Sequence, residues 1–272
     1  MKLAARAVVL ILLLAIVSAA QQLPVGTLLP VALSTAINAE KAKVGDRISG
    51  KLGQYVVMDS TRLPRGTKVA GRIVAVQPAS AASPARVAFV FDTLLLGNRD
   101  LPVKTSLRAL ASMQAVYDAQ LPTNTIDDYG SSIRDWNTTQ VGGQAVYRGD
   151  GTVMEGREVV GKATIVGEVF GKPKTWSWSP CERDRASNTV QSFWVFSTDA
   201  CGIYGFEGMK LAHAGRSEPA GEIVLESPGK LNVRAGSGLL LMVTSSTQQP
   251  ERGPTASHSA LSSSSIEVAI QR

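Results

Sequence analysis

Between Leu23 and Val103 the chain is a succession of short runs rich in Val, Ile, Leu and Phe, separated at regular intervals by Gly and Pro. Because Gly and Pro end strands and form tight turns, this punctuation predicts several short β-strands. Within one run, Val69 and Ile73 share a face while Val74 lies on the other, so both faces are partly apolar. Such a strand suits the wall of a barrel or sandwich that other elements cover. The best strand predictions are Arg47–Leu52, Tyr55–Met58, Lys68–Val76 and Arg86–Leu96.

The first twenty residues predict export. Lys2 and Arg6 precede an uncharged apolar run from Ala7 to Val17, and small residues at 18–20 then offer a cleavage site before Gln21. The alternative, an uncleaved anchor helix, needs about 20 apolar residues to cross a bilayer. No later segment has that length, so we expect no transmembrane helix in the mature chain. Removing residues 1–20 lowers the formal net charge from +6 to +4. The remaining charge is scattered, which argues against nucleic-acid binding.

A single helix is expected from 105 to 121. Within Thr105–Gln120, Leu107, Leu110 and Tyr117 occupy one stripe at spacings typical of a helix, and Pro122 ends the pattern. A second β-rich region follows, with Asp150 and Gly151 as the turn of a tight hairpin. The C-terminal segment is rich in Ser and poor in large apolar residues, so we expect it to be disordered.

These patterns predict an all-β protein, a small β-barrel or sandwich with one short helix and a β-rich, disulfide-bearing insertion. The expected order is a signal peptide at 1–20, the N-terminal part of the barrel at 21–104, the helix at 105–121, the insertion at 122–221, closing strands at 222–244 and the Ser-rich tail at 245–272.

The two cysteines, Cys181 and Cys201, both fall in the insertion. In an exported chain a pair of cysteines favours a disulfide, and a loop of this length is stabilised by about 3 kcal/mol. The alternative is a catalytic thiol, for which His213 is the nearest base in sequence.

The sequence contains no recognisable catalytic or metal-binding motif. His213 and His258 are the only histidines, and a zinc site would have to recruit carboxylates without a spacing signature. A Ser-His-Asp triad can be composed from Asp199, His213 and Ser217, which would make the protein a hydrolase of unrecognised type. We expect instead a non-enzymatic protein without cofactors or metal.

Tryptophans suggest a possible binding surface. Trp176 and Trp178 lie two residues apart, as do Trp194 and Phe196, so each pair would share one face of a strand. If exposed, Trp176, Trp178 and Trp194 could stack on sugar rings, as in a carbohydrate-binding module, or bind a protein partner. If buried, they fill a core.

Short segments of the chain share a pattern of turn and strand residues: Gly26–Val31, Thr35–Asn38, Leu63–Gly71, Ala85–Leu94 and Leu231–Gly236, the last leading into Leu239–Val243. These segments resemble the TrbI-type β-barrel of conjugation and type IV secretion channels. The resemblance covers about a third of the chain and lacks that family's proline-rich stalk and inner-membrane anchor; the cysteine-bearing region is foreign to the family pattern. It implies an envelope scaffold in the periplasm or at the outer envelope, which docks to other envelope proteins or self-associates, with no catalytic residues to carry over.

Overall fold

The computed structural model describes residues 23–58, 61–123, 132–177 and 179–246. The predicted signal peptide and the tail beyond 246 lie outside these residues. The described part is nearly all β, with one short α-helix, α2 (Met113–Asp118), and a 3-10 turn at Ile133–Asp135. The all-β prediction is therefore confirmed.

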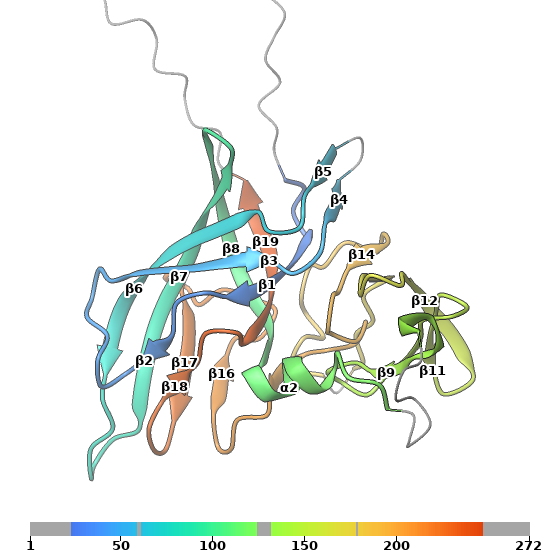
Figure 1. Ribbon diagram of the computed structural model, residues 1–272. Coiled ribbons are helices and arrows are strands. Elements are labelled where there is room, and N and C mark those ends of the chain that lie inside the picture. Colours follow the sequence, from blue (N-terminus) through green and yellow to red (C-terminus); the bar gives the residue numbers. More distant parts are fainter. Residues whose placement is uncertain (1–22, 59–60, 124–131, 178, 247–272) are drawn as a thin grey trace, which may run out of the picture.

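Six strands close into a barrel. Each strand is hydrogen-bonded to the next in the order β8, β19, β1, β3, β6 and β7, and β7 pairs again with β8. Figure 1 shows this barrel on the left, with the insertion beside it. The strands are β1 (Leu28–Leu33), β3 (Arg47–Leu52), β6 (Lys68–Gln77), β7 (Ala85–Leu96), β8 (Arg99–Ala111) and β19 (Gly238–Ser246).

The C-terminal strand β19 completes the ring by pairing antiparallel with β1 on one side and β8 on the other. The expectation that residues 222–244 close the barrel is correct for this strand, which continues to Ser246, two residues into the segment expected to be tail. β17 (Ile223–Ser227) instead extends the sheet by pairing with the first half of β7. β18 (Asn232–Val233) pairs with β2 (Ile37–Asn38) as a separate ribbon.

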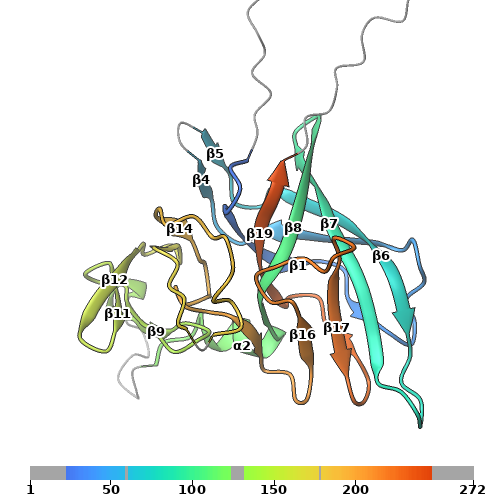
Figure 2. The ribbon, with the colours of Figure 1, turned by 180° about the vertical axis from the view of Figure 1, so that it is seen from behind.

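Smaller elements surround this ring. β4 (Val56–Met58) and β5 (Thr61–Leu63) form a hairpin that rises from the barrel on the side of the insertion, above β14 in both views (Figures 1 and 2). β15 (Gly202–Tyr204) and β16 (Lys210–Ala212) join the edges of the barrel sheet. The insertion has its own six-stranded sheet, made of β9 (Asn137–Thr139), β10 (Ala145–Tyr147), β11 (Thr152–Glu155), β12 (Glu158–Ala163), β13 (Val169–Gly171) and β14 (Gln191–Ser192).

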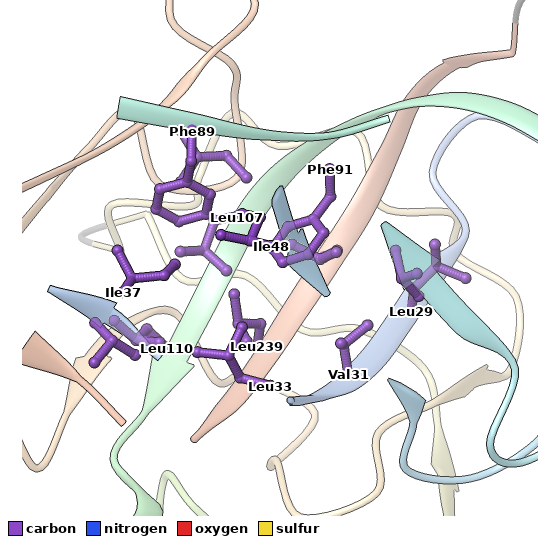
Figure 3. Packing of buried hydrophobic residues seen from close by; sticks show 14 of the residues in the cluster. Leu29, Val31, Leu33, Ile37, Ile48, Phe89, Phe91, Leu107, Leu110 and Leu239 are labelled. Carbon is purple, nitrogen blue, oxygen red and sulfur yellow. The ribbon is translucent and has the colours of Figure 1, made fainter. Parts of the chain in front are cut away.

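The helix expected from 105 to 121 is wrong over its first half, because residues up to Ala111 belong to β8. Opposite β19 the register shifts: Leu240 pairs with Ala109 and Leu241 with Leu107, which leaves Arg108 as an extra residue. Such a bulge puts two residues on the same face and redirects a side chain. Leu107 and Leu110 consequently both face the barrel interior (Figure 3), and their spacing of three imitates a helix.

Both faces of one barrel wall are buried. Leu239 and Leu241 of β19 pack in the barrel interior, whereas Leu240 and Met242 pack against the insertion. Successive side chains of such a strand therefore point alternately into two different cores, and neither face of the strand is exposed to water. The insertion covers this wall, and the candidate site lies where the insertion and the barrel meet.

Candidate functional site: an apolar groove beside the barrel

Gln54 joins the barrel to the insertion at the base of the β4–β5 hairpin. Its side chain is fully buried. Nε2 donates to the Val169 carbonyl at 2.9 Å, and Oε1 accepts from the backbone N–H groups of Val169 at 2.9 Å and Trp194 at 2.6 Å. One amide thus takes the place of a strand partner and satisfies three buried backbone groups. It fixes β13 relative to the hairpin.

Arg108, the extra residue of the β8 bulge, makes a second connection. Its buried guanidinium forms an ion pair with Asp184, which is also buried. Nε donates to the Ala200 carbonyl at 3.0 Å and Nη2 to the Lys174 carbonyl at 2.7 Å. Burial lowers the pKa of Arg108 to about 10, which is still well above neutral pH. The side chain therefore remains charged and binds three separate parts of the insertion.

The predicted disulfide is present. Cys181 and Cys201 are bonded, with their Cα atoms 5.9 Å apart. The bond lies in the same region as the Arg108 contacts, since Ala200 precedes one cysteine and Asp184 follows the other by three residues. It closes the segment that carries β14. The disulfide, Gln54 and Arg108 together hold the insertion against the barrel wall.

Between the hairpin and the insertion lies an apolar groove, with a cavity volume of about 650 Å³. Tyr55 and Phe170 form its aromatic part, with ring centroids 5.0 Å apart and planes tilted by 45°. Around them are three exposed valines from three different segments: Val57 of β4, Val159 of β12 and Val190 just before β14, exposed by 44, 58 and 57%. We call these five residues the groove.

The rim of the groove is mainly cationic. Lys162 and Lys172 line it and form no ion pair within the described part of the chain. The Arg62 guanidinium lies over the Tyr55 ring, 4.9 Å from its centroid. Lys174 is neutralised by carboxylates, since its Nζ lies 2.5 Å from Glu155 and 3.7 Å from Glu158. An occupant of the groove would therefore meet an apolar floor and unneutralised positive charge at the edge.

The three tryptophans do not form the expected surface. Trp194 is buried at 9% exposure, adopts a left-handed φ of 55° and packs its ring where a side chain on Gly53 would stand. It belongs to the core, in a turn rather than a strand. Trp176 is exposed, but its segment is not a strand either, and Trp178 lies outside the described residues. The argument from a spacing of two therefore fails for Trp194, whereas a surface formed by Trp176 and Trp178 stays a prediction.

Asp199, His213 and Ser217 each have other partners. The His213 Nε2 lies 3.1 Å from Glu218, the Asp199 carboxylate accepts from Ser197 at 2.7 Å, and the Ser217 hydroxyl donates to the Thr105 carbonyl at 3.3 Å. The structure gives no hydrogen bond between any two members of the suggested triad. Within the described ranges no three His, Cys, Asp or Glu residues are grouped so that they could hold a metal ion.

None of the helices in the described part of the chain has the length and apolarity that crossing a membrane requires.

Comparison of the chain with protein-family models, with curated proteins and with solved structures finds no match. The class of the protein is therefore defined by its architecture: a six-stranded β-barrel with a disulfide-bonded β insertion against one wall and an apolar groove at their junction.

Proposed function

We propose that this protein is an exported, non-enzymatic docking component of the cell envelope, and that the groove binds a partner protein. The observation that carries the proposal is the exposure of Val57, Val159 and Val190 around the Tyr55 and Phe170 rings. Contiguous exposed apolar surface is costly in water and commonly marks an interaction site. The disulfide supports an oxidising compartment, in keeping with export.

The charges define the occupant. It is a segment of another envelope protein, apolar at its centre and acidic on its flanks, because Lys162 and Lys172 line the groove and Arg62 lies over the Tyr55 ring. Aromatic and aliphatic side chains would fill the cavity, and the flanking carboxylates would pair with the lysines at the rim. We further propose that this partner belongs to a secretion or conjugation assembly, because several segments of the chain resemble TrbI-type barrels.

The test is site-specific photocrosslinking in the cells that produce the protein. A photoreactive residue at Val159 should give a discrete adduct with an envelope protein, and Val190→Asp in the same chain should abolish the adduct. The matched control carries the photoreactive residue at Val44, which is 68% exposed and lies in the loop before β3, outside the groove. Equal adducts from both positions, or none from Val159, would contradict the proposal.

A further inference from the structure

A second hollow, with a volume of about 520 Å³, lies at another part of the barrel. It is bounded by the ribbon of β2 and β18 and by the start of β3. Figure 1 shows this ribbon at the end of the barrel away from the β4–β5 hairpin. We call this hollow the barrel-end pocket. It shares no lining residue with the groove.

Three cations from separate segments line the barrel-end pocket. They are Lys41 from the loop after β2, Arg47 at the start of β3 and Arg234 just after β18. None of them forms an ion pair within the described ranges. The one carboxylate of the lining, Asp46, accepts a hydrogen bond from the Lys43 backbone at 2.7 Å, which closes the local turn. Three cations and one carboxylate give the lining of the pocket a net positive charge.

The rest of the lining suits a hydroxyl-rich ring. Ile48 and Ile73 lie beneath the hollow and are almost fully buried, so Ala36 and Ala42 supply its accessible apolar surface. Asn38 and Asn232, paired across the ribbon, supply amide groups. Asn38 uses its oxygen to cap the Glu40 N–H at 2.8 Å, which leaves its amide nitrogen as a donor. Sugar rings combine an apolar face with hydroxyl groups, and both requirements are met here.

Next to the barrel-end pocket, Asn232 and Arg234 also line a smaller hollow of about 310 Å³. Ser237 contributes to this hollow, and its fully buried hydroxyl has no hydrogen-bond partner in the part of the chain that the structure describes. A ligand that passes over Arg234 would reach both hollows.

We infer that the barrel-end pocket binds a phosphorylated saccharide. The guanidinium groups of Arg47 and Arg234 bind the phosphate, the asparagine amides bind ring hydroxyls, and the sugar ring lies against Ala36 and Ala42. Guanidinium forks suit phosphate oxygens because they donate two parallel hydrogen bonds. This site is independent of the groove and of the partner proposed for it.

Isothermal titration calorimetry of the purified protein tests the inference with trehalose 6-phosphate, trehalose and inorganic phosphate as probes. Trehalose 6-phosphate should bind at least about tenfold more tightly than either of the others, since each lacks one half of the recognised chemistry. Its affinity should fall as salt is added. Equal affinity for inorganic phosphate, or no heat with trehalose 6-phosphate, would overturn the inference.

The double variant Arg47→Gln, Arg234→Gln should weaken binding of trehalose 6-phosphate at least about tenfold and leave the melting temperature unchanged, because both side chains are exposed. Arg157→Gln, an exposed arginine on the insertion, is the matched control and should bind as the parent protein does. Vesicles containing phosphatidylglycerol test whether the pocket instead binds the phosphate of a lipid headgroup. Binding to these vesicles without binding to the soluble sugar phosphate would contradict a saccharide ligand, as would unchanged affinity in the double variant.

Discussion

At the residue scale, Arg108 shows how a single bulge decides a contact between two parts of the molecule. Because the bulge adds one residue to β8, the guanidinium leaves the barrel wall and meets Asp184 and two carbonyl groups of the insertion. The local sequence around Arg108 does not indicate these contacts, because the partners of its guanidinium lie 66 to 92 residues further along the chain. Sequence periodicity can therefore suggest neither the bulge nor the buried ion pair.

We predict that Arg108→Leu lowers the free energy of unfolding by about 3–5 kcal/mol, because it leaves the Asp184 carboxylate buried without its partner. The double variant Arg108→Leu, Asp184→Leu should recover part of this loss. Urea unfolding of both variants gives the comparison, with the exposed Arg157→Leu as control. A single variant within about 0.5 kcal/mol of the parent protein would show that the ion pair contributes nothing.

The same residue makes a prediction about pH. Burial lowers the pKa of Arg108 to about 10, so the unfolded chain binds more protons only between this value and the higher pKa of an arginine in water. The contribution of Arg108 to stability therefore rises with pH in that alkaline window and is constant below it. The loss caused by the double variant Arg108→Leu, Asp184→Leu, which leaves no unpaired carboxylate, should consequently be equal at pH 6 and pH 8, measured by urea unfolding at both. A loss that changes steeply between these two pH values would assign the effect to another group.

Gln54→Leu should lower the free energy of unfolding by at least about 2 kcal/mol, because the buried N–H groups of Val169 and Trp194 lose their acceptor. The exposed Gln77→Leu is the matched control. Equal unfolding curves for the two variants would mean that water replaces the amide at this junction.

At the element scale, local pattern predicts the strands of the barrel well and fails where a strand is buried on both faces. β3 coincides with the predicted Arg47–Leu52, and the Asp150–Gly151 turn joins β10 to β11, with Tyr147 opposite Thr152. These elements have turn residues at their ends. β8 follows the Gly97–Asn98 turn but has no such signal in its second half. There the insertion covers its outer face and the bulge interrupts its alternation, so the spacing of Leu107 and Leu110 imitates a helix.

The disulfide also acts at this scale, because it closes the segment that carries β14. Replacing Cys181 and Cys201 by Ser should lower the free energy of unfolding by about 3 kcal/mol. Reductant should lower the melting temperature of the parent protein toward that of the variant and leave the variant unchanged. Two titratable thiols in the native exported protein would contradict the disulfide.

At the scale of the whole molecule, the groove results from contacts that span most of the chain. Tyr55 and Val57 were predicted within a strand, but Phe170 and Val190 join them only when the insertion folds back on the barrel. The tryptophans attracted attention in the sequence because of their size and spacing, yet Trp194 is buried and the aromatic residues of the groove are Tyr55 and Phe170. Long-range packing decides which aromatic residues remain accessible, and no local pattern carries that information.

Closure of the barrel by its last strand is the central claim of this account, because β19 separates the interior core from the wall that the insertion covers. Without β19, the edges of β1 and β8 lose their hydrogen-bond partners. The most direct measurement compares urea unfolding of a chain ending at Ser246 with that of a chain ending at Ala220. The first should be soluble and unfold cooperatively, and the second should aggregate. A soluble, cooperatively folding fragment ending at Ala220 would contradict the barrel described above.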